Sequence, residues 1–383
     1  MALHFEVGEY QQRIAATTAM LQDRGLDGLL MFRQESMYYL TGYDTFGFCF
    51  FQCLYLDAQG QLILLTRAPD LRQAQNTSII DDIRIWVDRD GATPSDDLKS
   101  ILVDQGCAGR RLGVEYDAYG LNAKNGMILN ATLDGFFTLE DASDLVSALR
   151  MVKSPAELTY VRRAGELADD AWSQALETTA AGADEGEILA AMQGAVFKGG
   201  GDYAGNEFII GSGGDALLCR YFTGRKTLQA RDQLTLEFAG AYRHYHACMM
   251  RTIVVGDPTQ HQLHMYQAAA AALDACKDAL RVGRPIGAVF DAHARVMDDA
   301  GLQNARLNAC GYSLGAVFAP IWMDSPMFYH GNPVLAAPGM VFFLHMILMD
   351  SEAAQAMTLG ETVIVTETGH ERLSSAALDL AVR

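Results

Sequence analysis

The sequence predicts two domains, an α/β domain over residues 1–150 and an α+β domain over residues 151–383. In the first part, short apolar segments of strand length alternate with segments of helical periodicity. In the second part, four helical segments are interspersed with strands, two of which have the pattern of an antiparallel hairpin. A helix-start signal at Ser154 separates the two parts. A chain of 383 residues is long enough to bury a core in each domain.

The first domain begins with a helix whose apolar residues Tyr10, Ile14, Met20 and Leu21 share one face. This helix is expected to end at Gly25. Polar and helical connections separate the strand signals that follow, which is typical of a mixed sheet. The strands are expected at residues 28–32, 53–56, 62–66, 83–87 and 112–115.

The second domain begins with Ser-Pro-Ala-Glu at residues 154–157, which has an N-cap serine, a proline at the first helical position and a glutamate three residues after the cap. Apolar residues at helical spacing continue this helix to Leu176. A second helix is expected from Asp184, and two more at residues 260–280 and 286–300. Strands are expected at residues 207–211, 233–239, 244–255, 313–319, 340–348 and 361–366.

The hairpin at residues 234–252 is the most informative segment of the chain. It consists of an apolar strand, a turn predicted at residues 239–242, and a second strand. Because alternate side chains of a strand share a face, His246 and Cys248 should point the same way. Glu237 lies eleven residues before Cys248, on the other strand of the hairpin.

The net charge of −18 argues against a nucleic-acid partner, because a phosphate backbone requires a basic surface. It likewise gives no support for binding to an anionic membrane. The N-terminal residues lack the pattern of a signal peptide, and no apolar run reaches the ~20 residues that a membrane helix needs. Seven cysteines without a CxxC pair are typical of free thiols, so a cytoplasmic protein is expected.

Four landmarks carry a resemblance to a known family. They are residues 150–157, the hairpin at 234–252, Gly-Tyr-Ser-Leu-Gly at 311–315, and Pro-Gly-Met at 338–340 together with Val-Ile-Val-Thr-Glu-Thr-Gly at 363–369. The order and spacing of these landmarks match the creatinase/prolidase family, which the chain resembles over essentially its whole length. The resemblance implies a pita-bread C-terminal domain with an internal pseudo-two-fold. It also implies a homodimer whose active site borrows from the neighbouring N-terminal domain.

Metal-dependent members of this family use two aspartates, one histidine and two glutamates. The matching positions here hold Glu237, Cys248, Tyr312, His345 and Gly360. The resemblance therefore implies that Glu237 and Cys248 share one face of the hairpin. Two divalent cations bridged by water need several carboxylates to offset their charge, and this set supplies too few, even if the adjoining Glu361 takes the last position. The resemblance therefore points to the branch of creatinase and ectoine hydrolase, which works with no metal and no cofactor.

A single zinc or iron ion bound by Glu237, His246 and His345 remains an alternative, because carboxylate and imidazole suit both metals. Within the metal-free branch, the chain is most similar to the ectoine hydrolases. The similar segments are residues 39–44, 200–203, 237–246, 311–312 and 366–369. The chain departs from these relatives at Arg220, where they place a histidine at a substrate-contacting position. This departure leaves the substrate open.

Three residues are expected to carry the chemistry. Glu237 is expected to attack the substrate or activate water, and the alternative is a structural glutamate. His246 is expected to carry a proton because imidazole titrates near neutrality, and the alternative is a hydrogen-bonded core histidine. His345 interrupts an apolar strand, which indicates a site residue or a satisfied core histidine. Covalent attack by a Cys248 thiolate is a further alternative to an inert buried thiol.

Five residues are expected to bind the substrate. The Arg220 guanidinium matches a carboxylate bidentately, which indicates a clamp, and the alternative is a surface arginine. Asp202 is expected to pair with a substrate cation or to cap a loop, and Tyr312 to donate a hydrogen bond or to pack. Glu361 is expected to orient a histidine or to lie at an exposed strand end, and Trp322 to wall the pocket or to belong to the core.

The sequence therefore predicts a metal-independent hydrolase of a non-peptide C–N bond in a small zwitterion. Its most concrete form is the ring opening of a cyclic amidine that bears a carboxylate, as in the catabolism of compatible solutes. The alternatives are a creatinase-like amidinohydrolase, a metal-dependent Xaa-Pro dipeptidase with atypical ligands, and a non-catalytic protein that binds a small zwitterion.

Overall fold

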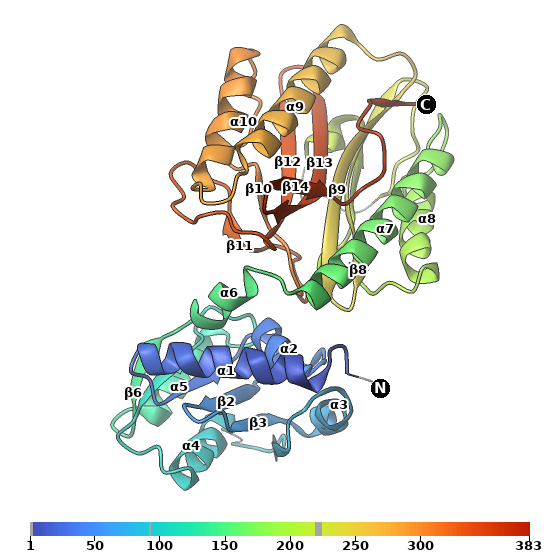
Figure 1. Cartoon of the computed structure of the whole chain (residues 1–383). Coiled ribbons are helices and arrows are strands. Elements are labelled where there is room, and N and C mark those ends of the chain that lie inside the picture. The colour runs from blue at the N-terminus through green and yellow to red at the C-terminus, as the bar shows by residue number, and fades with distance from the viewer. Residues whose placement is uncertain (1–2, 92, 219–223) are drawn as a thin grey trace. The chain divides into compact units, whose positions relative to one another are not determined.

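The chain forms two compact units, Met1–Arg150 and Met151–Arg383, in a computed structural model that describes residues 3–91, 93–218 and 224–383 (Figure 1). The first unit is α/β and the second is α+β, so the predicted fold class is confirmed. Within the described residues, no helix combines the length and the apolar character required to cross a bilayer.

A six-stranded sheet forms the centre of the first unit, in the order β4-β3-β2-β1-β5-β6. Strand β1 pairs antiparallel with β2 and parallel with β5, which confirms the prediction of a mixed sheet. Side chains of β1 alternate between two hydrophobic clusters, with Leu30 in one and Leu29 in the other, so both faces are covered. The elements of this unit are α1 (Val7–Asp23), β1 (Gly28–Met31), α2 (Gln34–Thr41), β2 (Cys53–Asp57), β3 (Leu62–Arg67), α3 (Leu71–Thr77), β4 (Asp82–Trp86), α4 (Pro94–Asp104), β5 (Arg111–Val114), α5 (Ala123–Leu133), β6 (Thr138–Asp141) and α6 (Leu145–Arg150).

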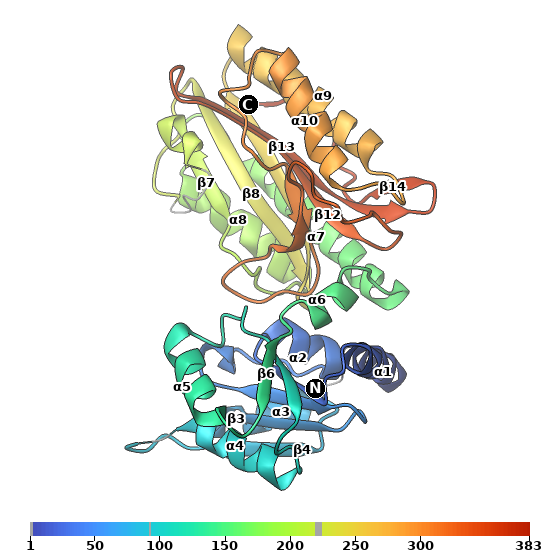
Figure 2. The same ribbon diagram turned by 90° about the vertical axis from the view of Figure 1, so that its left-hand side faces the viewer.

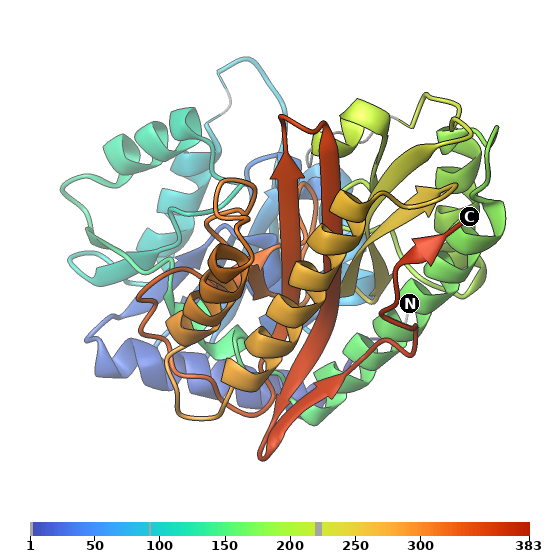
Figure 3. The same ribbon diagram turned by 90° about the horizontal axis from the view of Figure 1, so that it is seen from above.

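A nine-stranded sheet forms the centre of the second unit, with the path β11-β10-β12-β13-β9-β8-β7, and with β14 paired to β13 and β15 paired to β9 (Figure 2). Its strands are β7 (Ile209–Ser212), β8 (Asp232–Tyr242), β9 (Tyr245–Val255), β10 (Gly311–Ser313), β11 (Asp324–Met327), β12 (Val341–Asp350), β13 (Gln355–Thr366), β14 (Gly369–Arg372) and β15 (Ala381–Val382). Its helices are α7 (Pro155–Thr178), α8 (Glu185–Lys198), α9 (Gln260–Ala279) and α10 (Gly287–Asp299). Helix α7 contacts β8 and β9, and α9 contacts β12 and β13 (Figure 3).

The start of α7 has the predicted capping box. The Ser154 hydroxyl accepts from the Glu157 amide at 3.3 Å, and the Glu157 carboxylate accepts from the Ser154 amide at 2.9 Å. The other oxygen of Glu157 accepts a 2.7 Å hydrogen bond from the Tyr245 hydroxyl at the start of β9. The cap therefore connects the first turn of α7 to the hairpin strand that carries the candidate site.

The turn of the central hairpin lies at Arg243 and His244, so the predicted turn at residues 239–242 is wrong. Both turn residues have positive φ angles, 50° and 65°, as a two-residue hairpin turn of the type I′ family requires. Gly240, within the predicted turn, lies inside β8. A Cβ atom at Gly240 would come within 1.9 Å of the Ala164 carbonyl oxygen of α7. The glycine therefore permits close packing of helix on strand.

We expect Ser154→Ala to lower the free energy of unfolding by about 0.5–2 kcal/mol, because it removes the side-chain acceptor of the cap. Ser173→Ala, an exposed change later in the same helix, is the control and should leave the unfolding midpoint essentially unchanged. Urea unfolding of the full chain followed by circular dichroism measures both. Equal midpoints for the two variants would contradict the role of the cap.

Candidate active site

The candidate site lies on the face of the second sheet that points away from helices α7 and α9. Alternate residues of β12, including Phe342, Leu344 and Met346, belong to the hydrophobic cluster that α9 and α10 form with the sheet. Successive side chains of a strand point to opposite faces, so Phe343 and His345 point to the other side.

One row of side chains crosses four strands on this site face. His345 of β12 pairs with Gly360 of β13, Gly360 pairs with Met250 of β9, and Met250 pairs with Glu237 of β8. Residues directly opposite one another in an antiparallel sheet share a face. Cys248, two residues before Met250, therefore shares it as well. The sequence-based inference that Glu237 and Cys248 share a face thus agrees with the strand register.

Tyr312 links the two ends of the row. It lies on β10 and pairs with Phe343, so its side chain is on the site face. Its hydroxyl donates to Glu237 Oε1 at 3.2 Å, and the ring centroids of Tyr312 and His345 are 5.5 Å apart. The Trp322 indole nitrogen donates to the Tyr312 hydroxyl at 2.8 Å. The structure therefore brings together four of the residues singled out from the sequence, namely Glu237, Tyr312, Trp322 and His345.

The Cys248 thiol is held in its neutral form. Burial raises the pKa of Cys248 well above its usual value, and the Glu237 carboxylate raises it further. The same two causes, burial first, raise the pKa of Tyr312 well above its usual value. Because a thiolate and not a thiol is the nucleophile, this environment disfavours covalent attack by Cys248.

His246 is fully buried, and backbone groups engage both of its ring nitrogens. Nε2 accepts from the Gly205 amide at 2.8 Å, and Nδ1 therefore carries the proton that it donates to the His244 carbonyl oxygen, also at 2.8 Å. Burial lowers the pKa of His246 to about 4. This geometry matches the alternative of a hydrogen-bonded core histidine, and it gives no support to a proton carrier.

Glu361 lies on the opposite face of the sheet. It pairs with Leu344 of the helix-facing cluster, and it is fully buried. Its carboxylate forms an ion pair with Lys277 of α9 at 3.3 Å and a second with Arg372 of β14. The structure therefore does not bring Glu361 to the candidate site, and its environment is that of a structural carboxylate.

Asp202 caps the central hairpin. Its carboxylate accepts from the His244 amide at 3.2 Å, and its own amide donates to the Ala241 carbonyl oxygen at 2.9 Å. This arrangement corresponds to the loop-capping alternative. Arg220, the expected carboxylate clamp, lies outside the described residues.

The residues at the family's metal-ligand positions do not fit a dinuclear metal centre. In the described ranges 3–91, 93–218 and 224–383, no group of three or more His, Cys, Asp and Glu residues could hold an ion. A Cβ atom at Gly360 would come within 2.9 Å of both Phe343 Cε2 and the Leu344 carbonyl oxygen. The Phe343 ring thus occupies the space that a side chain at position 360 would need. A mononuclear site that uses His246 is also disfavoured, since both of its nitrogens are engaged.

Phe343 is the residue of this site that was not singled out from the sequence. Its signal was its spacing of two from His345 within one apolar strand, which places both side chains on one face.

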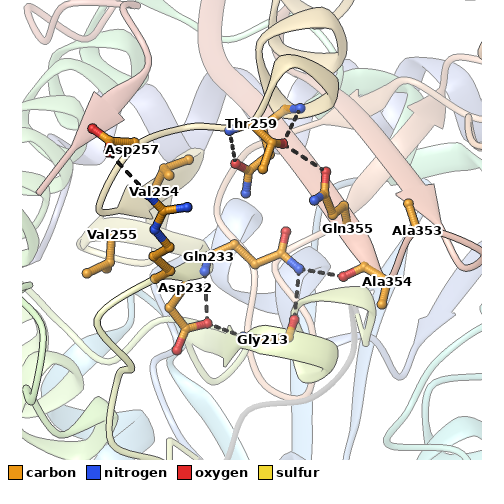
Figure 4. A pocket seen from close by; sticks show the side chains of 12 residues that line it. Gly213, Asp232, Gln233, Val254, Val255, Asp257, Thr259, Ala353, Ala354 and Gln355 are labelled. Carbon is orange, nitrogen blue, oxygen red and sulfur yellow. Dashed lines mark hydrogen bonds and ion pairs between the residues drawn. The ribbon is translucent and has the colours of Figure 1, made fainter.

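Two pockets adjoin strand β8. A pocket of about 10 Å³ adjoins Glu237, with Met250 and Thr358 in its wall, and this volume is at the lower limit for holding one water molecule. A pocket of about 240 Å³ lies at the far ends of β8 and β9, where Gln233 and Gln355 are among the residues that line it (Figure 4). Its Gln233 side chain is fixed by hydrogen bonds to the carbonyl oxygens of Gly213 and Ala354, so this second pocket is built from structural contacts.

An α/β unit followed by a pita-bread unit defines the class of the creatinase and aminopeptidase P fold. The chain belongs to metallopeptidase family M24, whose model matches residues 159–367. The creatinase/prolidase N-terminal domain matches residues 13–152. The resemblance to the creatinase/prolidase family is therefore confirmed, and with it the pita-bread fold.

Relatives of different activities are similar to the chain. The ectoine hydrolase of Halomonas elongata is 28% identical over 405 residues, which cover 100% of this chain and 99% of that protein. The Xaa-Pro dipeptidase of Pyrococcus furiosus is 25% identical over 240 residues, which cover 62% of this chain and 67% of that protein. The prolidase structure from Thermococcus sibiricus superposes with a TM-score of 0.88 at 19% identity, covering 98% of this chain and 99% of that one. This last similarity concerns the fold alone.

We expect stability to depend on the ionisation of His246. An unfolded histidine takes up a proton near pH 6.5, whereas folded His246 does so only near pH 4. Its contribution to stability is therefore complete above pH 6.5 and is lost as the pH falls toward 4, at up to about 1.4 kcal/mol per pH unit. His246→Asn should flatten this part of the profile, because Asn both donates and accepts but does not titrate.

Urea unfolding between pH 4.5 and 7.5 measures this effect. His330→Asn is the control, since the His330 side chain is 82% exposed, and it should keep the wild-type slope. A His246→Asn variant with the wild-type slope would show that His246 is not held neutral by its surroundings.

Proposed function

We propose that the chain is a metal-independent hydrolase of a non-peptide C–N bond in a small zwitterionic amidine or guanidino acid, with ectoine hydrolase-like ring opening as the leading form. The observation that carries this proposal is the environment of Glu237. Its carboxylate accepts a hydrogen bond from Tyr312, and both residues stand where metal-dependent relatives place ligands. The full-length similarity to an ectoine hydrolase supports the same activity.

The charge of the site face favours a substrate with one positive charge. Along β8, β9, β12 and β13, each described throughout, Glu237 is the only carboxylate on this face. The neighbouring Cys248 and Tyr312 are held neutral by burial. One carboxylate can balance an amidinium or guanidinium, whereas two divalent cations require several anionic ligands.

The proposed reaction adds water to the cationic carbon and breaks one of its C–N bonds. Glu237 attacks this carbon itself or takes a proton from the attacking water, and water supplies the oxygen of the product in both cases. The departing nitrogen leaves as an amine after it accepts a proton. His345, whose ring lies beside Tyr312, is the candidate donor on this face. We propose that Arg220 binds the carboxylate of the substrate. A guanidinium pairs well with a carboxylate, and the resemblance implies a substrate-contacting residue at this position.

The proposal extends to the assembly and the location of the protein. We propose a homodimer, on the family resemblance, and a cytoplasmic location, which the free cysteines favour.

A metal-dependent Xaa-Pro dipeptidase is the second candidate. It is favoured by the similarity to the Pyrococcus furiosus dipeptidase and by membership of a metallopeptidase family. Purified protein should be assayed with ectoine, hydroxyectoine, creatine and an Xaa-Pro dipeptide. Turnover of creatine would favour a creatinase-like activity, and turnover of the dipeptide alone would reject our proposal. Tight binding of a zwitterion without turnover would indicate a binding protein.

Glu237→Gln should lower kcat by at least about a hundredfold, because the amide neither attacks nor accepts a proton. The matched control is Glu207→Gln, which changes an exposed glutamate of the same unit and should retain wild-type activity. Circular dichroism should show both variants folded. Near-native turnover by folded Glu237→Gln would remove Glu237 from the chemistry.

We expect EDTA to leave turnover unchanged and the purified enzyme to hold less than about one-tenth of an equivalent of bound transition metal, because the donor set lacks the carboxylates of a dinuclear centre. Elemental analysis and activity before and after dialysis against EDTA test this expectation. Loss of activity with EDTA, restored by added zinc, manganese or iron, would favour the dipeptidase.

A further inference from the structure

Trp322 lies between β10 and β11, and it is almost completely buried, with 2% of its surface exposed. Its indole N–H donates to the Tyr312 hydroxyl at 2.8 Å. An indole nitrogen can only donate, so Trp322 occupies a lone pair of the hydroxyl oxygen. The hydroxyl proton of Tyr312 then remains for Glu237 Oε1, 3.2 Å away. The three side chains therefore form a string of two hydrogen bonds, in which Trp322 donates to Tyr312 and Tyr312 donates to Glu237.

We propose that Trp322 is a positioning residue for the hydrolysis, a role that rests on the proposed function of Glu237. It holds the Tyr312 hydroxyl in the orientation that donates to Glu237, and thereby fixes the carboxylate in one rotamer with Oε1 as a hydrogen-bond acceptor. Trp322 itself acts through Tyr312 and does not touch the reacting atoms.

The direction of these hydrogen bonds also bears on which groups accept and donate protons in the proposed reaction. Glu237 Oε1 accepts from Tyr312, which leaves Oε2 as the oxygen that attacks the substrate carbon or takes a proton from water. When Glu237 attacks the carbon, the proton for the departing nitrogen comes from a different group. His345 meets this requirement by position, since its ring centroid lies 5.5 Å from that of Tyr312.

A double-mutant cycle tests the string by enzyme kinetics. Trp322→Phe keeps an aromatic ring but removes the donor, and we expect kcat to fall about ten- to a hundredfold while KM changes less than about threefold. Tyr312→Phe should lower kcat by at least as much. In the Tyr312→Phe background, Trp322→Phe should cost nothing further, because the hydroxyl that it orients is gone.

The matched control is Trp86→Phe. Trp86 is also buried and donates its indole N–H at 2.9 Å, but to the backbone carbonyl oxygen of Phe51 in the first unit. The kcat of the Trp86→Phe variant should remain that of the wild type. Equal losses from Trp322→Phe in both backgrounds, or no loss in the wild-type background, would overturn the positioning role and leave Trp322 as a packing residue.

A second measurement needs no substrate. The chain has three tryptophans, so their indole N–H resonances can be assigned by replacement in protein labelled with ¹⁵N-tryptophan. Tyr312→Phe and Glu237→Gln should both shift the Trp322 resonance and leave that of Trp86 unchanged. An unshifted Trp322 resonance in Tyr312→Phe would overturn the proposal. If the resonances shift but the wild type hydrolyses no amidine or guanidino acid, the proposed function fails while the orienting contact stands.

Discussion

The register of the antiparallel strands β8, β9, β13 and β12 determines which of their side chains point to the candidate site. A slip of one residue would exchange the faces of a strand and would turn Glu237 toward helix α7. Several contacts hold this register. The tight turn at Arg243 and His244 sets the pairing of β8 with β9. The Thr362 hydroxyl contacts both the amide and the carbonyl oxygen of Cys248, which fixes β13 against β9.

The two faces of the second sheet differ in electrostatic character. On the helix-facing side, Glu361 is paired with Lys277 and Arg372, and the buried Arg251 guanidinium, whose pKa burial lowers to about 10, donates to the Gly360 carbonyl oxygen. On the site face, Glu237 is accompanied by neutral polar and aromatic groups along the central strands. The charged groups that stabilise the fold thus lie on the opposite face of the sheet from Glu237, the carboxylate that we assign to the chemistry.

The sequence was sufficient for the fold class, because hydrophobic periodicity and helix caps act locally. It also placed Glu237 and Cys248 on one face, because both residues hold metal-ligand positions of the family. It was not sufficient for the turn, because Gly240 serves contact with α7, which is a tertiary requirement. The engagement of His246 Nε2 depends on Gly205, forty-one residues away in sequence, and could not be read from the hairpin. The face of the sheet to which Glu361 points depends on the pairing of β13 with β12, because an offset of one residue would place its side chain on the opposite face.

The Phe343 ring over Gly360 makes the packing of this position intolerant of a side chain. A Cβ atom here would come within 2.9 Å of the ring and of the Leu344 carbonyl oxygen. A mutation that placed a carboxylate at position 360 would therefore meet an aromatic ring on one side and a backbone oxygen on the other. To install a metal ligand at this position, an engineer would need coordinated changes at several residues, each unfavourable by itself.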